Sequence, residues 1–360
     1  MNARIARERL GNQGLAGPGR RGPADVVGWL GAVQAQEYAP AKWGLALRMS
    51  ARATDAEIER AVNAGRMLRT HVLRPTWHFV TPADIRWMLE LTAPQVHRRM
   101  APYNRRLGLD PAVLVRAPAV FERALRDGHC LTRTELAGHL ERAGLPYKGT
   151  HLAHLAMYAE LEGVITSGPR RGKQFTYALL EERAPQARRL PRDEGLAELI
   201  RRYFRSHGPA TARDFAWWSG LTMADARRGL DMSGARRRDV DGRTYWTVAR
   251  PQQRDAGRPA VHLLPVYDEF LVAYRDRDAV PHGGYAFQTR PSGTVTFPHS
   301  LVIDGQVSGT WRARETPDGL MVDLLPRKRL SAVERRAIAR EAARYGRFLG
   351  RPVSLSMGQG

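Results

Sequence analysis

Two glutamines separated by one small residue are the side chains in this sequence that could assist a reaction. They are Gln34 and Gln36, and they follow a segment, 24–33, in which apolar residues recur at helical spacing. An amide is no strong base, but its oxygen can orient a water molecule and lie close to a developing positive charge. The pair therefore suits a hydrolysis that needs little acid–base assistance.

The backbone around this pair decides whether both amides reach one site. Successive residues of a helix are rotated by about 100°, so side chains two residues apart point to nearly opposite sides. The predicted helix must therefore end or distort near Gln36 if both glutamines are to act on one water molecule, and Pro40 marks the end of the helical pattern. The alternative is a pair of solvent-facing glutamines at a helix end.

Other kinds of catalytic site find little support in the sequence. His151 and His154 lie one helical turn apart, which would allow a zinc pair, but ordinary polar helix positions explain them as well. Cys130 is the only cysteine, which excludes an internal disulfide, and it lacks a third group beside His129 that would complete a nucleophilic site. We therefore predict neither a metal site nor a cofactor.

Basic and aromatic residues gather on two short predicted strands, 68–73 and 76–81. These residues are Arg69, His71, Arg74, Trp77 and His78. Side chains of these types contact phosphates and bases in complexes with nucleic acids. The alternative is that the tryptophan belongs to the core and that internal hydrogen bonds satisfy both histidines.

A second charged segment contains Asp268, Glu269, Arg275 and Arg277. Adjacent residues of a regular strand point to opposite faces, so Asp268 and Glu269 are not expected to enter one site. Pairing between these acids and arginines would explain the segment without any function.

The charge balance favours a polyanionic partner. The chain of 360 residues has 57 Lys and Arg against 36 Asp and Glu, a formal net charge of +21, which suits nucleic acid. Nearly all of the cations are arginines, so a GC-rich genome is an alternative explanation. No apolar run is long enough to span a membrane and the N-terminus does not resemble a signal peptide, so we expect a cytoplasmic location.

One pattern of elements occurs three times along the chain. Helices that begin with a Thr-x-x-acid capping signal are followed each time by a short hairpin that carries basic residues. Three helices and a hairpin form the winged-helix plan, in which the last helix or the hairpin usually contacts the duplex. We predict three such units, residues 1–105, 106–190 and 191–255, with linkers near 181–192 and 250–260.

The remaining residues, 256–360, have the pattern of strands. Segments 261–267 and 271–274 begin the series, Asp304-Gly305 predicts a tight hairpin, and 331–348 predicts an amphipathic helix. We expect a small β-barrel-like module, so the predicted fold class is α+β.

Together these motifs resemble the winged-helix DNA glycosylases of the AlkZ/YcaQ type, in the branch with a Gln-apolar-Gln signature. The resemblance rests on Gln34-Ala35-Gln36, on 73–79, and on 267–269 with 274–277, and it spans nearly the whole chain. It implies three tandem winged helices and a β-barrel that form a concave DNA-binding surface.

The resemblance also implies an activity. Members are monofunctional DNA repair glycosylases that hydrolyse the N-glycosidic bond of N7-alkylated purines and can unhook interstrand crosslinks, and some protect a producer from its own DNA-alkylating product. Gln34 and Gln36 would hold the nucleophilic water. The partner would be double-stranded DNA carrying alkylated purines, bound by a monomer that associates with the nucleoid.

In these terms the sequence offers a set of candidate DNA contacts. The last three residues of the set lie on the return strand of the Asp304-Gly305 hairpin, a candidate minor-groove probe. The candidates are Lys42, Arg69, His71, Arg74, Trp77, His78, Arg275, Arg277, Trp311, Arg312 and Arg314. The alternative function is a non-catalytic tandem winged-helix DNA-binding protein or transcription regulator, which would usually dimerise on a palindrome and would not need the two glutamines.

Overall fold

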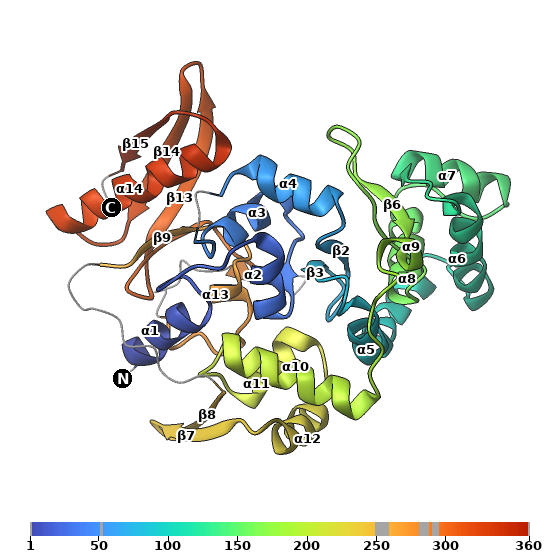
Figure 1. Ribbon diagram of the computed structural model, residues 1–360, viewed down its shortest axis with the longest axis horizontal. Coiled ribbons are helices and arrows are strands. Elements are labelled where there is room, and N and C mark those ends of the chain that lie inside the picture. The colour runs from blue at the N-terminus through green and yellow to red at the C-terminus, as the bar shows by residue number, and fades with distance from the viewer. Residues whose placement is uncertain (1, 51–52, 249–258, 281–287, 290–294, 359–360) are drawn as a thin grey trace.

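The computed structural model describes residues 2–50, 53–248, 259–280, 288–289 and 295–358. We divide the chain into a first helical region (2–106), a second (111–183), a third (192–247) and a C-terminal region (259–358). Figure 1 shows the first region, in blue, between the C-terminal region, in orange and red, and the second region, in green. The third region, in yellow, lies below them in this view.

The first region carries the glutamine pair. Its strands form a three-stranded antiparallel sheet in the order β1-β3-β2. The Thr54 side chain accepts a hydrogen bond from the Glu57 N–H and so caps the fourth helix, as the sequence predicts. The elements are α1 (Asn2–Asn12), α2 (Pro23–Leu30), β1 (Val33–Gln34), α3 (Tyr38–Ala46), α4 (Asp55–Asn63), β2 (Leu68–His71), β3 (Trp77–Val80) and α5 (Ile85–Arg106).

The second region has the helices and the hairpin at the predicted places. Thr132 and Glu135 form a complete capping box at the start of α7. The sheet has the order β4-β6-β5. The elements are α6 (Pro111–Leu125), β4 (Leu131–Thr132), α7 (Arg133–Arg142), α8 (Thr150–Leu161), β5 (Ile165–Ser167), β6 (Thr176–Leu179) and α9 (Leu180–Arg183).

The third region ends in a hairpin that its turn residues specify. Asp241 and Gly242 have φ angles of 49° and 73°, and a two-residue turn of this kind needs positive φ at both positions. The elements are α10 (Arg192–Ser206), α11 (Ala212–Ser219), α12 (Met223–Ser233), β7 (Arg236–Val240) and β8 (Arg243–Thr247).

The C-terminal region is an open sheet rather than a barrel. In the part of the chain that the structure describes, five strands follow the order β15-β14-β13-β12-β9, so the sheet has two edges and does not close. The helix α14 supplies Ile338 and Phe348 to the core that the sheet shares, so a helix covers apolar surface that a barrel would enclose. The elements are β9 (Val261–Leu264), α13 (Glu269–Val272), β10 (Gln288–Thr289), β11 (Val295–Thr296), β12 (Ser300–Ile303), β13 (Gln306–Thr316), β14 (Gly319–Pro326), α14 (Ala332–Leu349) and β15 (Val353–Met357).

The prediction of a strand over 271–274 was wrong. The segment 269–272 is the one-turn helix α13. The side chain of Asp268 accepts a hydrogen bond from the Phe270 N–H at 2.9 Å and caps this helix, so local capping outweighs the strand preference of Val272 and Tyr274. Most of the predicted linker 250–260 lies outside the described residues.

The hydrophobic cores cross the predicted unit boundaries. One core joins the first region, through Leu30 and Trp43, to the C-terminal sheet, through Leu301 and Trp311. Another joins α5 to the helices of the third region, and the second region has a core of its own. The ranges 1–105, 106–190, 191–255 and 256–360 therefore remain predictions, and the first region does not bury its apolar surface alone.

The hairpin of the second region packs against the first region. Ser167 accepts a hydrogen bond from the Arg69 N–H at 2.8 Å, and the Arg170 N–H donates to Asn63 at 2.8 Å. The ring of Phe175 lies 4.7 Å from the guanidinium groups of both Arg69 and Arg170. In the winged-helix plan this hairpin would contact a duplex, but here it joins two regions of the protein.

No helix among the described residues is long and apolar enough to cross a membrane.

Candidate active site

Gln34 ends the strand β1, Gln36 lies in the bend that follows it, and both side chains line one cavity. Helix α2 ends at Leu30 because Gly31 takes a φ of 88°, so the predicted helix over 24–33 stops three residues early. Gln34 then pairs with His78 across β1 and β3, and the Ala35 N–H donates to the Trp77 carbonyl at 2.7 Å. In extended backbone, residues two apart point to the same side. Because the helix gives way to a strand, both glutamines can face one site, which a straight helix would not have allowed.

The cavity that receives both side chains, named here the glutamine cavity, has a volume of about 960 Å³. Helices α5 and α11 and the segment after β9 supply its other walls. Four arginines, Arg74, Arg99, Arg213 and Arg275, line it, with Glu37 as the one carboxylate among its described lining residues. A cavity of this charge suits a phosphate backbone.

Gln34 is the more tightly held of the pair. It is buried, its backbone N–H donates to Glu269 Oε1 at 2.8 Å, and its side-chain Oε1 accepts from Arg74 Nη2 at 2.8 Å. Gln36 is half-buried, and its Oε1 accepts a longer hydrogen bond, 3.3 Å, from the Trp77 N–H. Both amides are therefore oriented before any ligand binds, Gln34 the more firmly.

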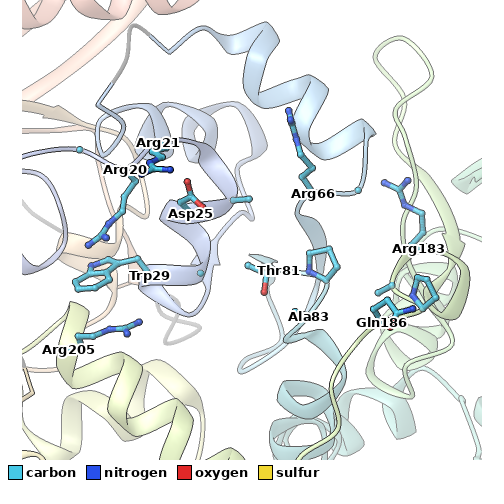
Figure 2. Close-up of a pocket in the computed structure, with 17 residues that line it drawn as sticks. Arg20, Arg21, Asp25, Trp29, Arg66, Thr81, Ala83, Arg183, Gln186 and Arg205 are labelled. Carbon is cyan, nitrogen blue, oxygen red and sulfur yellow. The ribbon is translucent and has the colours of Figure 1, made fainter.

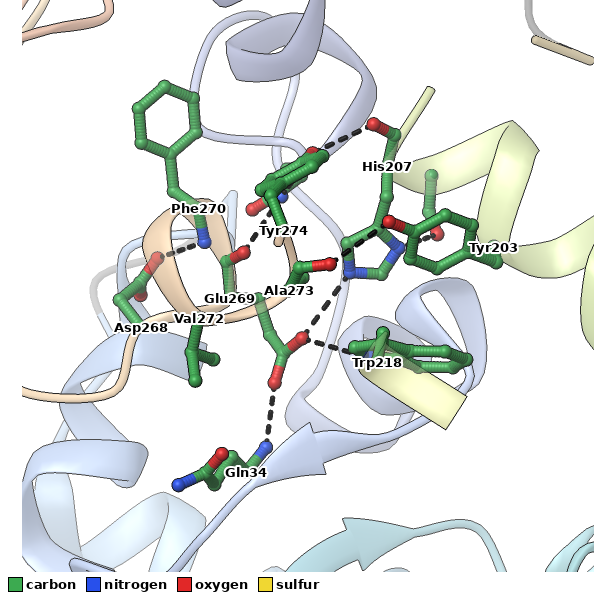
Figure 3. A network of polar contacts seen from close by, with 12 residues as sticks. Gln34, Tyr203, His207, Trp218, Asp268, Glu269, Phe270, Val272, Ala273 and Tyr274 are labelled. Atoms are coloured by element: carbon green, nitrogen blue, oxygen red, sulfur yellow. Dashed lines mark hydrogen bonds and ion pairs between the residues drawn. The ribbon is translucent and has the colours of Figure 1, made fainter. Parts of the chain in front are cut away.

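Glu269 binds the backbone of Gln34 and holds it in place. Figure 3 shows its carboxylate between the Gln34 backbone and the side chains of Trp218 and His207. Trp218 Nε1 donates to Glu269 Oε2 at 3.0 Å, and His207 Nε2 lies 3.4 Å from the same oxygen. Burial alone would raise the pKa of Glu269, but the contact with His207, the Gln34 N–H and the charge of Arg74 together bring this pKa below its usual value. Glu269 is therefore a buried anion.

The neighbouring Asp268 faces different surroundings. It forms an ion pair with Arg48 in which two Oδ–Nη distances are 2.8 Å. The prediction that the two acids do not enter one site is confirmed, although they sit at the start of a helix rather than on a strand. Asp268 pairs with Arg48, not with Arg275 or Arg277.

His78 lies beside Arg74, and its imidazole is neutral. Its Nδ1 lies 2.9 Å from the Thr76 carbonyl, which only accepts, so Nδ1 carries the proton. Nε2 is then free to accept from Arg74 Nη2, 3.5 Å away. Burial first, and then the charge of Arg74, lower the pKa of His78 to about 3. The same guanidinium thus contacts both His78 and the amide of Gln34.

The state of His78 predicts how stability changes with pH. Because its pKa is about 3 in the folded chain and about 6.5 when unfolded, protons bind preferentially to the unfolded chain as the pH falls. We expect His78 to lower the unfolding free energy by up to about 1.4 kcal/mol for each pH unit below pH 6.5, and to leave it unchanged above that pH. Urea unfolding between pH 7.5 and pH 5 measures this slope.

Two variants isolate the contribution of His78. His78→Asn should reduce the slope of unfolding free energy against pH by the equivalent of up to one bound proton. His129→Asn, at an exposed position, should leave this slope as in wild type. Equal slopes for wild type and both variants would contradict a buried neutral histidine.

The predicted DNA contacts separate into exposed and buried groups. Arg275, Arg312 and Arg314 are exposed, and Trp77 and Arg277 are half-buried. Arg275 lines the glutamine cavity, while Arg312 and Arg314 both pair with Asp323, at 3.2 and 3.0 Å. The buried candidates are Lys42, Arg69, His71, Arg74, His78 and Trp311.

Burial argues against a direct DNA contact for His78, described above, and for Lys42 and Trp311. The Lys42 ammonium group is bound by Asp55 at 2.8 Å and Glu59 at 2.7 Å, and it is nearly inaccessible. Trp311 donates from Nε1 to the Leu264 carbonyl inside the core. Trp311 lies on the predicted return strand of the hairpin, but packing turns it inward. Lys42 lies on α3, a helix that was not predicted because the helical pattern was expected to end at Pro40.

Packing argues against the minor-groove probe at Asp304-Gly305 as well. The turn exists, with φ angles of 51° and 82°, but Gly305 packs on α1, where an added Cβ would lie 3.0 Å from Ala6 Cβ. The Asp304 side chain also accepts from the Ala260 N–H at 2.9 Å. A turn fixed in this way is not free to enter a groove.

The other basic and aromatic candidates form a stack beside the cavity. Arg69 lies 4.3 Å from the Trp77 ring, and its Nε donates to the Ala35 carbonyl at 2.9 Å. His71 pairs with the buried Glu160 and packs on Trp77, with ring centroids 4.4 Å apart. These contacts surround the segment 34–36 that carries both glutamines.

The histidines considered for zinc have ordinary partners. His151 Nε2 lies 3.0 Å from the Leu107 carbonyl, and His154 Nδ1 lies 2.7 Å from Asn104 Oδ1. Across the described residues, no group of three or more His, Cys, Asp or Glu side chains could hold a metal ion.

Sequence reasoning missed the residues that reach the cavity from distant parts of the chain. Arg99 comes from α5, and Arg213 and Trp217 come from α11. The role of Glu269 as the anchor of Gln34 was missed too, since 235 positions separate the two residues. Its place in a motif of the resembled family was the only signal that could have indicated it.

Comparisons with known proteins identify the family of the chain. The family model described as DNA glycosylase AlkZ-like matches residues 27–348. A curated relative, the interstrand DNA cross-link repair glycosylase of Streptomyces sahachiroi, is 27% identical over 353 residues, 91% of each chain. The solved structure of Streptomyces sahachiroi DNA glycosylase AlkZ has the same fold, with a TM-score of 0.77 over 98% of each chain at 24% identity. The chain therefore belongs to the AlkZ-like family of DNA glycosylases.

Proposed function

We propose that this DNA glycosylase hydrolyses the N-glycosidic bond of N7-alkylated purines, with Gln34 and Gln36 as its catalytic residues. The observation that carries the proposal is the placement of both glutamines in the lining of one cavity that also contains four arginines. The arginines would bind the DNA backbone, and the amides would bind the water that attacks the sugar.

The chemistry of this substrate suits amides. An N7-alkylated purine is cationic and leaves readily, so the sugar approaches an oxocarbenium ion with little help from an acid. What remains is to position a water molecule and to stabilise developing positive charge. The carbonyl oxygen of Gln34 has a second lone pair beyond the one that Arg74 occupies, and Gln36 adds another acceptor beside it. The reaction needs no catalytic lysine if the enzyme is monofunctional.

The named activity of the Streptomyces relative supports a wider substrate range. That protein is described as an interstrand DNA cross-link repair glycosylase. We infer that this chain also unhooks crosslinks joined through alkylated purines, and that it gives self-resistance to a DNA-alkylating natural product. The volume of the glutamine cavity, about 960 Å³, leaves room for such a bulky adduct.

The finer architecture belongs to the same proposal. We infer that the first, second and third helical regions are winged-helix units and that the enzyme acts as a monomer on duplex DNA, in the cytoplasm with the nucleoid. The succession of helices and a hairpin in the second and third regions supports this inference. Exposed Arg275, with half-buried Trp77 and Arg277, supplies the proposed contacts near the lesion.

The direct test is release of base from duplex DNA that contains N7-methylguanine. We expect wild type to release the methylated base, to leave an unmodified duplex intact, and to lose this activity in the double variant Gln34→Ala/Gln36→Ala. Release of 7-methylguanine is measured by chromatography, and abasic sites by alkaline cleavage of the strand.

One result would favour the non-catalytic alternative. If wild type releases no base from methylated or crosslinked duplexes, yet binds DNA with an affinity that falls steeply with salt, the chain is a DNA-binding protein without chemistry on these substrates.

A further inference from the structure

A second cavity lies at the opposite end of β3 from the glutamine cavity. It has a volume of about 1070 Å³ and is lined by Thr81 and Ala83, just beyond β3, by the outer face of α2 and by the end of α9. Thr76, just before β3, lines the glutamine cavity instead, and the two cavities share no lining residue. Figure 2 shows the second cavity, named here the arginine cavity.

The lining of the arginine cavity is strongly positive. Asp25 is the one acid among its described lining residues. The arginines that line it form no ion pair with any carboxylate in the described part of the chain, although many arginines elsewhere do, such as Arg202 with Asp84. These arginines are Arg20, Arg21, Arg66, Arg183 and Arg205.

Two of these cations are held beside one tryptophan. The guanidinium groups of Arg20 and Arg205 lie 3.6 Å and 4.5 Å from the Trp29 ring, as the labelled side chains in Figure 2 show. The ring itself is fixed because Trp29 Nε1 donates to the Asn12 carbonyl at 2.6 Å. Cation–π attraction thus offsets the repulsion between like charges and keeps both side chains in place.

A third cation is fixed on the opposite wall. Arg183 Nη2 donates to the carbonyls of Val62 and Asn63, at 3.0 and 3.2 Å, at the end of α4. Its guanidinium rests on Gly65, where an added Cβ would lie 3.2 Å from Cζ. The buried Nε groups of Arg183 and Arg205 have no hydrogen-bond partner within the described structure. Donors of this kind call for an acceptor.

We propose that the arginine cavity binds the phosphate backbone of a second DNA segment, apart from the duplex whose lesion enters the glutamine cavity. Guanidinium groups are planar forks that match phosphate oxygens, and a polyanion neutralises several of them at once. With Arg20 and Arg205 beside its ring, Trp29 is not open for base stacking, so recognition is of the backbone and independent of sequence. The proposal rests on the proposed function only in assigning the lesion to the other cavity.

The number of duplexes that each chain binds tests this proposal. With excess short undamaged duplex at low salt, analytical ultracentrifugation should find two duplexes per wild-type chain. Arg21→Glu/Arg66→Glu changes two exposed side chains of the arginine cavity and should leave one duplex per chain. Arg123→Glu/Arg336→Glu, which reverses two exposed arginines of α6 and α14, makes the same change in net charge and should still bind two.

Base release separates the two cavities. The Arg21→Glu/Arg66→Glu variant should release 7-methylguanine from a short duplex at a rate within about twofold of wild type, because it leaves the glutamine cavity intact. Because binding is measured with undamaged DNA, it does not depend on the proposed reaction, and failure of that reaction would show only in the release assay.

Three outcomes would overturn the proposal. The first is one duplex per wild-type chain. If the arginine cavity then binds polyglutamate, added as a probe in place of DNA, its partner is an acidic protein and not a second DNA segment. The second is two duplexes on the Arg21→Glu/Arg66→Glu variant. The third is an equal loss of binding and base release in that variant, which would place the arginine cavity on the path of the lesion duplex.

Discussion

Replacing Gln34 with alanine should lower the rate of base release by about 10²–10³-fold, a loss typical of one preorganised polar group in an active site. Gln36→Ala should cost about tenfold, the worth of one weaker hydrogen bond. The difference follows from the structure, because Gln34 is buried and bound by Arg74 and Glu269, whereas Gln36 is half-buried and bound through one longer contact. Single-turnover release from N7-methylguanine duplex measures both rates.

A glutamine outside the glutamine cavity supplies the matched control. Gln186→Ala removes an exposed amide from the arginine cavity and should release base at the wild-type rate. DNA affinity should change little in any of the three variants, since the arginines remain. A greater loss with Gln36→Ala than with Gln34→Ala would show that burial and prior orientation do not decide which amide dominates.

Glu269→Gln should slow base release by about 10–10²-fold and lower the unfolding free energy by about 3 kcal/mol. The new amide can still accept from the Gln34 N–H, but its NH₂ group then takes the place of Oε2, where Trp218 Nε1 already points a donor at 3.0 Å. Two donors would face each other inside the core, and β1 would shift with Gln34. Single-turnover release at low temperature, together with urea unfolding, separates the two effects.

Two further variants show whether Glu269 positions Gln34 or only stabilises the fold. Asp268→Asn breaks a buried ion pair with Arg48 and should lower stability, yet leave the rate of base release unchanged because Asp268 does not contact Gln34. Trp218→Phe removes the opposing donor and should restore part of the rate when combined with Glu269→Gln. A Glu269→Gln variant that is less stable but releases base at the wild-type rate would limit Glu269 to a structural role.

Several parts of the fold could be predicted because the responsible interactions are local. The capping boxes at Thr132 and Thr211 begin α7 and α11, and Asp304-Gly305 forms the predicted tight turn. Each of these signals depends on residues at most three positions apart, so it acts in the same way in any tertiary context. The same holds for the amphipathic helix α14.

The errors of prediction arose where burial or packing between distant segments decides. The helix α14 covers the sheet that was expected to close into a barrel. The helix at Asp268 is an exception, because its cap is local and the strand preference of the segment concealed it. Lys42 and Trp311 are residue types that often contact DNA. Inside the protein, however, two carboxylates from α4 bind Lys42, and a backbone carbonyl accepts a hydrogen bond from Trp311. A pattern of residue types does not reveal such partners.

For the glutamine pair, the sequence by itself determined which side chains could act and which condition the backbone had to meet. It also supplied, through Gly31, the residue that ends the helix early. Only the tertiary structure decided how the condition is met, because β3 had to pair with β1 before Gln34 and Gln36 could point the same way. Tertiary structure likewise brought Glu269 within hydrogen-bond distance of Gln34, and Arg213 into the cavity wall. Contacts over such distances along the chain form only when the regions pack together.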